Sequence, residues 1–152
     1  GFDVNAETEL SGSIRNMTML ANAYAEATTV KIAFVTGKAY GPVFVAFAGK
    51  NSNSDMTFAL ADAVITPLAP ETAIEFLHHD MLKGAENVAD KRKSLADEYS
   101  QNDASAIAAA EKSAVDDVIE ANEIRARLIG AIDVLNGKRV SGLSKKHSNM
   151  PL

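Results

Sequence analysis

The stretch VKIAFVTGKAYGPVFVAFAG, residues 30–49, decides the fold of this chain, and its pattern predicts a strand, a glycine turn and a helix. Residues 30–36 form a nearly continuous run of apolar and β-branched side chains, which is typical of a strand covered on both faces. Gly37 and Gly41 mark the turn that follows. A proline just inside the next apolar run and a glycine just past its end predict a short buried helix over residues 42–48.

The amino end of that helix would face the carboxyl end of the strand, a place that suits an anion. The first amides of a helix have no partner inside it and carry the positive end of the helix dipole, so backbone N–H groups alone can hold an enolate or oxyanion. Pro42 has no N–H, which leaves Val43 and the Gly41 turn as donors. The same pattern also fits an ordinary packed α/β layer, because a glycine turn without a spacing motif is not specific.

The composition limits the classes of protein to which the chain can belong. Its 152 residues, 47% of them hydrophobic, suffice for one domain with a hydrophobic core. The net charge of −5 argues against a general nucleic-acid binder. The absence of cysteine excludes disulfides, thiolate metal sites and a cysteine nucleophile. No apolar run approaches the length of a membrane span and residues 1–16 lack a secretory pattern, so we expect a cytoplasmic protein without a membrane partner.

Around the central stretch, the sequence predicts helices that alternate with short strands. We expect an irregular entry over residues 1–10 and then a helix over 11–28, capped by Ser11 or Thr8. The pattern of a strand, a turn and a helix that begins at a proline then recurs. Strands are predicted at 56–61 and 63–68, a strand or turn at 115–119, and helices at 70–83, 85–101, about 103–113 and about 123–136.

The spacing of apolar residues also predicts which helix faces are buried. The 85–101 helix is mostly charged and is expected to present a solvated face. Asn102 or Asp103 is expected to cap the helix that follows it, and Asn122 the last helix. The buried faces are predicted to hold Ala73, Ile74, Leu77 and Met81 in the 70–83 helix, and Ile124, Leu128, Ile132 and Leu135 in the last one.

No cluster of catalytic side chains stands out. The histidines, His78, His79 and His147, include no pair at the i, i+4 spacing of a helical zinc site, so we expect no metal. Asp116 and Asp117 are adjacent, and capping or solvation explains such a pair more simply than acid–base chemistry does. Chemistry that relies on backbone donors, with the base supplied by a substrate or cofactor, fits this sequence.

Four segments resemble one family: YAEATTVKIAFV (24–35), GKAYGPVFVAF (37–47), AVDDVIEANEIRARL (114–128) and KKHSNMPL (145–152). Together they look like the carboxyltransferase (β) subunits of biotin-dependent acyl-CoA carboxylases, such as propionyl-CoA and acetyl-CoA carboxylase, and the related decarboxylases. The resemblance runs along the whole chain, in order. It implies an α/β fold of the crotonase (ClpP/crotonase-like) type, a spiral of ββα units. Residues 1–152 would be the later part, a carboxyl-terminal carboxyltransferase domain without the first strands, with a basic tail at 138–152.

The resemblance further implies an activity and its partners. A carboxyl group would pass between carboxybiotin, held on a separate biotin carboxyl carrier, and an acyl-CoA, through an enolate held by backbone amides. The acyl-CoA would bind mainly to an amino-terminal carboxyltransferase domain of another subunit, and the protein would form a homo-oligomer.

The family pattern K-A-Y/F-G-G-A-Y assigns roles to the central turn. Its second glycine and its alanine, which give amides to biotin, fall on Pro42 and Val43. The resemblance thus assigns the catalytic amides to Val43 and Gly41, the biotin and oxyanion region to Lys38, Ala39, Tyr40 and Pro42, and the acyl pocket to Phe44 and Val45. No metal ligand is implied.

Pro42 leaves a second function open. Because this residue cannot donate an N–H, the chain could instead be a non-catalytic assembly subunit with a degenerate biotin site. A crotonase-type hydrolase or isomerase that acts alone would need an acid or base in the pocket, and the sequence offers none.

Overall fold

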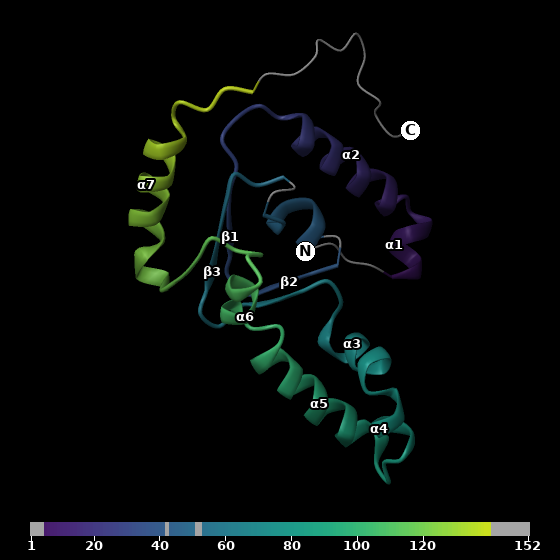
Figure 1. The fold of residues 1–152 in the computed structure, drawn as a ribbon. Helices are drawn as coiled ribbons and strands as arrows, with labels where there is room; N and C mark the ends of the chain where they lie inside the picture. Colours follow the sequence, from purple (N-terminus) through teal and green to yellow (C-terminus); the bar gives the residue numbers. More distant parts are fainter. Residues whose placement is uncertain (1–4, 42, 51–52, 141–152) are drawn as a thin grey trace.

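Two small parallel sheets form the centre of the protein. The computed structural model describes residues 5–41, 43–50 and 53–140 (Figure 1). One sheet has the order β1-β3-β5, with β1 at Ile32–Val35, β3 at Met56–Leu60 and β5 at Asp117–Ile119. The other pairs β2, Lys38–Tyr40, with β4, Val64–Thr66. All these pairings are parallel, as expected where helices connect the strands.

The chain repeats a ββα unit. In the first unit β1 and β2 lead to η1, a π-helix at Phe44–Ala48, and in the second β3 and β4 lead to α3 at Pro70–Leu77. This order confirms the predicted recurrence of strand and helix, and the second helix begins at Pro70 as predicted, whereas Pro42 lies outside the described residues. One detail of the prediction is wrong, because residues 38–40 are not a turn. They form β2, whose backbone pairs with β4 from Lys38 opposite Val64 to Tyr40 opposite Thr66.

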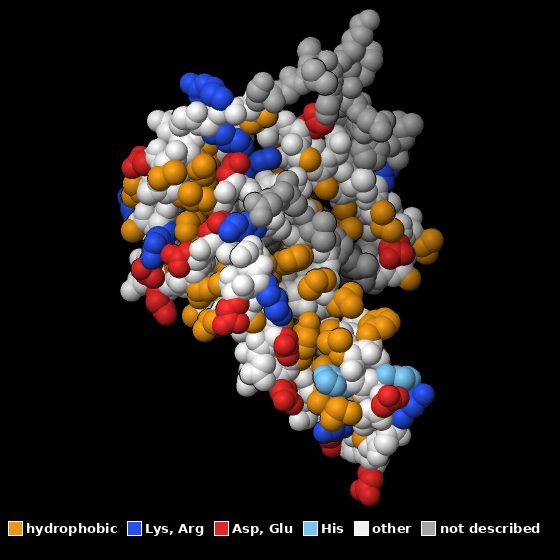
Figure 2. All heavy atoms as spheres, in the orientation of Figure 1, with side chains coloured by type: hydrophobic (Ala, Val, Ile, Leu, Met, Phe, Trp, Pro, Cys, Tyr) orange, Lys and Arg blue, Asp and Glu red, His pale blue; other side chains and the backbone are white. Residues whose placement is uncertain are grey.

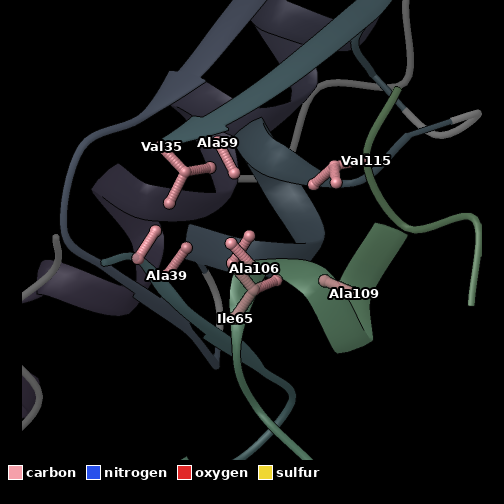
Figure 3. Close-up of a cluster of buried hydrophobic side chains, with 8 residues drawn as sticks. Val35, Ala39, Ala59, Ile65, Ala106, Ala109 and Val115 are labelled. Atoms are coloured by element: carbon pink, nitrogen blue, oxygen red, sulfur yellow. The ribbon is translucent and has the colours of Figure 1, made fainter. Parts of the chain in front are cut away.

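The three-stranded sheet is covered on both faces, which explains its apolar run. Side chains alternate along a strand, so neighbours in β1 face opposite sides. Phe34 stacks on Phe58 at 5.1 Å between ring centroids, on the side where α7, Ile124–Leu135, packs. Val35 faces the other side, into a core between the two sheets (Figure 3). That core combines both sheets with α6, Ala106–Glu111, and contains Val35, Ala39, Ala59, Ala63, Ile65, Ala106, Ala109 and Val115.

Helices at the amino end differ from the sequence prediction in two respects. The helix expected over 11–28 is α2, Ser13–Glu26, and its packing against η1 places it beside the first unit. The irregular entry expected over residues 1–10 is wrong, since Ala6–Leu10 form the helix α1. Neither predicted residue caps α2, whose N-cap is Gly12. Thr8 shares a capping box with Asn5 at the start of α1, and Ser11 is the C-cap of α1.

A helical arm extends away from the sheets (Figure 1). The single helix expected over 70–83 is interrupted at His78, whose φ of −126° and ψ of 29° are not helical, and continues as α4, His79–Lys83. This break changes the phase of the apolar face. Leu82 is therefore buried, whereas Leu77 and Met81, which were predicted to be inward, are largely exposed.

The arm is closed by α5, Val88–Asn102, the predicted charged helix. Its buried residues, Leu95 and Ala96, pack with Ile74 and Leu82 in a small core of their own. The hydroxyls of Tyr99 and Thr66, 3.1 Å apart, share a hydrogen bond that ties the arm to β4.

The last two helices have caps that the sequence prediction missed. Ser105, not Asn102 or Asp103, caps α6 by accepting the N–H of Ala108. Before α7, a 3₁₀ turn at Ala121–Glu123 is closed by a capping box between Glu120 and Glu123, so Asn122 is not the cap. This turn shifts the buried face of α7. Its deeply buried residue is Ala131, while Leu128 and Ile132, predicted to be inward, stay exposed.

Large apolar side chains remain exposed on several helices. In the view of Figure 2 they gather over α3 and α4, and α7 carries others. The most exposed are Leu10, Phe76, Leu77, Ile107 and Val134. In the part of the chain that the structure describes, no helix is long and apolar enough to cross a membrane.

Candidate functional site

A cavity lies at the carboxyl end of β1, where the sequence predicted an anion site. Its volume is about 380 Å³. The walls come from α2, from β1 and its link to β2, and from the segment that carries η1. The lining residues are Tyr24, Ala33, Phe34, Val35, Thr36, Gly37, Lys38, Ala39, Val43 and Phe47.

The helix predicted over residues 42–48 forms one wall of the cavity, and it is a π-helix rather than an α-helix. Residues 44–48 form a π-helix, a conformation that occurs often at functional sites, and the predicted stop at Gly49 is confirmed. Val43 directly precedes η1 and already has helical φ and ψ angles of −66° and −44°. Both Val43 and Phe47 line the cavity, so one side of η1 forms its wall.

The amide of Gly41 already has a partner. Gly41 has a φ of +62°, in the left-handed region that glycine adopts without strain, and its N–H donates a 3.0 Å hydrogen bond to the carbonyl of Pro67. This bond extends the pairing of β2 with β4 by one residue. Gly41 and Val43 were predicted to donate their amides to a ligand. The Gly41 amide is already hydrogen-bonded within the sheet.

The structure brings together only part of the predicted site. Lys38, Ala39 and Val43 line the cavity. Tyr40 instead continues β2, opposite Thr66, and Phe44 packs against the core between the sheets. Pro42 and the side chain of Val45 lie outside the described part of the structure.

Sequence reasoning missed two aromatic residues of the cavity wall, Tyr24 and Phe47, and the lysine that packs on one of them. Tyr24 and Phe47 meet edge to face, with ring centroids 5.1 Å apart and an interplanar angle of 69°. The Lys31 ammonium lies 5.3 Å from the centroid of the Tyr24 ring and also donates a 3.1 Å hydrogen bond to the Tyr24 carbonyl. Tyr24 looked like one more apolar residue of a helix. Only the packing of α2 on η1 reveals its place in the wall.

A charged cluster fixes the opposite end of β1. The Asp55 carboxylate accepts the Lys31 N–H at 2.7 Å and the Lys138 ammonium at 2.8 Å, and Lys138 also donates to the carbonyl of Thr29 at 3.0 Å. Burial raises the pKa of Asp55, but the hydrogen bonds from Lys138 and Lys31 and their positive charges outweigh it. The pKa thus lies below its ordinary value. Lys138, the first residue of the predicted basic tail, therefore anchors the chain after α7 to the segment before β1 and to Asp55.

The adjacent acids have structural partners, but these are ion pairs and a strand amide rather than the helix cap or solvent that was expected. Asp116 accepts the N–H of Thr57 at 2.8 Å and pairs with Lys50 at 2.8 Å. Asp117 pairs with Arg127 at 3.0 Å. Among the residues that the structure describes, no three histidine, aspartate or glutamate side chains could together hold a metal ion.

The chemistry available to the cavity is mainly that of its backbone. Its floor is apolar, and among the described residues that line it only Tyr24, Thr36 and Lys38 have polar side chains. These described lining residues offer neither a carboxylate nor an imidazole for acid–base chemistry. The arrangement suits a ligand with an apolar body whose developing negative charge meets an amide at the amino end of η1.

Comparison with known proteins agrees with this description. A family model described as the carboxyl transferase domain matches residues 1–150. The chain is 37% identical over 152 residues to the carboxyltransferase subunit of propionyl-CoA carboxylase from Haloferax mediterranei. This match covers 100% of this chain and 30% of that protein. It is 36% identical over 152 residues to the alpha subunit of methylmalonyl-CoA decarboxylase from Propionigenium modestum, again over 100% of this chain and 29% of the relative.

A solved structure shares the fold. It is that of transcarboxylase 12S, a hexamer with methylmalonyl-coenzyme A and methylmalonic acid bound. The TM-score is 0.87 at 31% sequence identity, and the match covers 100% of this chain and 29% of that one. This similarity and the two ββα units confirm the crotonase-type α/β fold predicted from the resemblance. The chain spans about three tenths of the length of the relatives that it matches.

Proposed function

The chain belongs to the carboxyl transferase domain family, and from this premise we propose that it forms the carboxyl-terminal domain of a biotin-dependent acyl-CoA carboxyltransferase. It would move a carboxyl group between carboxybiotin on a separate carrier and an acyl-CoA held largely by an amino-terminal carboxyltransferase domain. The observation that carries the proposal is the cavity at the end of β1, in which the amino end of η1 meets an apolar floor and the described lining residues include no carboxylate or imidazole.

The residues of the cavity fit a biotin group. Its volume of about 380 Å³ and its walls of Ala33, Val35 and Phe47 suit a compact, largely apolar bicyclic ring. When bound, biotin would supply the transferable carboxyl group and the base for the substrate's α-proton. The N–H of Val43 would hold the negative charge that develops on an oxygen at the amino end of η1. Lys38 would attract the anionic carboxyl group at the mouth, and Tyr24 with Phe47 would confine the ring.

The proposal is tested by carboxyl exchange between carboxybiotin and a series of acyl-CoAs. We would assay this chain alone and the complete gene product, each with and without the substitution Pro42→Gly. Since Pro42 lacks an N–H, glycine at this position adds a donor, and a missing oxyanion donor can cost about a hundredfold in rate. We expect exchange in the complete protein and a faster reaction in the variant. No exchange in either form would sink the catalytic proposal.

A non-catalytic assembly subunit is the second candidate. Two observations favour it: the Gly41 amide is engaged with Pro67, and Pro42 has no amide proton, which together leave few free donors at the turn. Under this alternative Pro42→Gly restores nothing, while the protein still enters a complex. The expected cytoplasmic location is common to both candidates and stays a prediction.

Both candidate functions require the chain to associate with another subunit. Phe76 on α3 and Val134 on α7 leave 75% and 72% of their surface exposed, and large exposed apolar faces favour a partner. The solved transcarboxylase relative is a hexamer, which supports a homo-oligomer here. Sedimentation of the complete gene product should show an oligomer, and Val134→Glu should weaken it more than Arg125→Glu, which changes an exposed polar residue on the same helix. A stable monomer would contradict the proposal.

A further inference from the structure

Two side chains of the loop after η1 hold the carboxyl end of this π-helix. The amide Nδ2 of Asn53 donates a 2.8 Å hydrogen bond to the carbonyl of Ala46, and the Oγ of Ser54 donates a 2.8 Å bond to the carbonyl of Phe47. The last carbonyls of any helix lack a partner within it, and π-helical bonding rarely continues beyond a single turn. The two bonds give partners to carbonyl groups near the end of η1 and so tie its backbone to the segment that enters β3.

The loop that supplies these donors is itself anchored to the sheet. Ser54 is buried, with 9% of its surface exposed. Asp55, the next residue, accepts the N–H of Lys31 at the start of β1 and the ammonium of Lys138. The chain then enters β3 at once. The carboxyl end of η1 is therefore fixed relative to β1 and β3 rather than to a free loop.

The place of η1 determines the shape of the cavity. Val43 and Phe47 lie at the start and near the end of the segment and both line the cavity, whereas Asn53 and Ser54 do not. A change from i→i+5 to i→i+4 bonding would turn the later residues about the helix axis and move Phe47 relative to Val43. The edge-to-face contact of Phe47 with Tyr24 would be lost in the same movement.

We propose that Asn53 and Ser54 are positioning residues: they keep η1 π-helical and so set where the Val43 amide and the Phe47 ring stand in the cavity. The link to carboxyl transfer rests on the proposed function, but the hold on η1 is a property of the fold and can be measured separately. Neither residue lines the cavity, so neither would touch a group bound in it. Their effect passes through the backbone of η1.

The test uses the complete gene product with the substitutions Ser54→Ala and Asn53→Asp, the second of which keeps the shape but removes the N–H donor. Ser100→Ala is the matched control, since Ser100 Oγ donates a similar 2.7 Å bond to the carbonyl of Ala96 on α5, away from the cavity. Amide hydrogen exchange would be followed by mass spectrometry over residues 43–49 and over β1 and β3. Carboxyl-transfer kinetics would give kcat and KM.

We expect the amide hydrogens of residues 43–49 to exchange with solvent about fivefold to a hundredfold faster in both variants than in the wild type. The amides of β1 and β3 should stay protected from exchange. Misplacement of a transition-state donor lowers kcat, here by about tenfold or more, with a smaller change in KM. Ser54→Thr, which keeps a hydroxyl, should return both measurements toward the wild-type values, and Ser100→Ala should change neither.

The outcomes separate this proposal from the proposed function. If amide hydrogen exchange at residues 43–49 is unchanged in the variants, Asn53 and Ser54 do not hold η1, even if the wild-type protein transfers carboxyl groups. Faster exchange with unaltered kcat and KM overturns the positioning role. If the wild-type protein does not transfer carboxyl groups, both the proposed function and the positioning role in it fail. Amide hydrogen exchange still decides whether the two side chains hold η1. Should Ser54→Ala unfold the whole protein, Asn53→Asp, at a less buried residue, gives the decisive measurement.

Discussion

The N–H of Gly41 donates a 3.0 Å hydrogen bond to the carbonyl of Pro67, at the point where β2 and β4 end side by side. The bond joins corresponding positions of the two ββα units, each just before its helix. Gly41 also has a φ of +62°, which a residue without a side chain adopts without strain, so the chain can turn out of β2 directly after this bond. The glycine therefore has a structural role that does not depend on any ligand.

Gly41→Ala should lower the free energy of unfolding by about 1 kcal/mol, because an L residue is strained at positive φ. A Cβ at this position meets no atom within 4 Å, so strain in the backbone is the only expected cause. Gly37→Ala is the control, since its Cβ also meets nothing and its φ lies outside the left-handed region. Urea denaturation of both variants measures the difference, and an equal effect of the two substitutions would contradict the explanation.

Asp55→Asn should destabilise the protein in a pH-dependent way. The folded-state pKa of Asp55 lies below its ordinary value of 3.8, so its ionised form stabilises the fold above that pH, and the contribution is lost as the pH falls through the folded pKa. The difference in melting temperature between wild type and Asp55→Asn should thus be largest near neutral pH and shrink in acid. A difference that is constant with pH would show that the charge of Asp55 is not the cause.

Lys138→Ala should cost about 1–2 kcal/mol of stability, because Lys138 makes charged hydrogen bonds to Asp55 and to the backbone of Thr29 in a half-buried place. Arg127→Ala removes the exposed pair with Asp117 and should cost less than about 1 kcal/mol. Thermal denaturation of the two variants compares them. An ordering opposite to this would mean that the anchor at the start of β1 adds little.

Ile74→Ala should destabilise the helical arm strongly. Ile74 has no exposed surface, and the loss of a buried isoleucine side chain costs about 2–5 kcal/mol. Phe76→Ala, two residues away on the same helix, removes a side chain that is 75% exposed and should change stability by about 0.5 kcal/mol or less in the isolated chain. Urea denaturation distinguishes the two, and similar losses would mean that the arm is packed differently.

Tyr24→Ala should lower kcat/KM for carboxyl transfer by about tenfold, because it removes the ring that packs against Phe47 and Lys31 in the cavity wall. Tyr24→Phe keeps these ring contacts and should stay within about twofold of the wild type. Steady-state kinetics of the complete gene product compares them. If phenylalanine proves as harmful as alanine, the Tyr24 hydroxyl itself takes part in binding.

Local features were readable from the sequence where one interaction decides them. The run over residues 30–36 predicts a strand because both of its faces are apolar, and Phe34 and Val35 do pack on opposite sides of the sheet. Gly49 and Gly84 end their helices as expected. Caps were harder to predict, since Ser105 and Glu120 compete with several nearby polar residues of similar capping ability.

The sequence by itself determined the fold class and the recurrence of a strand, a turn and a helix. These follow from apolar periodicity, from prolines and glycines at fixed places, and from the resemblance of segments to a known family. Only the tertiary structure decided that residues 38–40 are the second strand of the first unit, that the Gly41 amide is engaged by Pro67, that Tyr24 lines the cavity, and that Asn53 and Ser54 donate hydrogen bonds to carbonyls of η1. The physical reason is that each of these depends on a partner brought close by the packing of the two units, and the local sequence does not encode which partner that is.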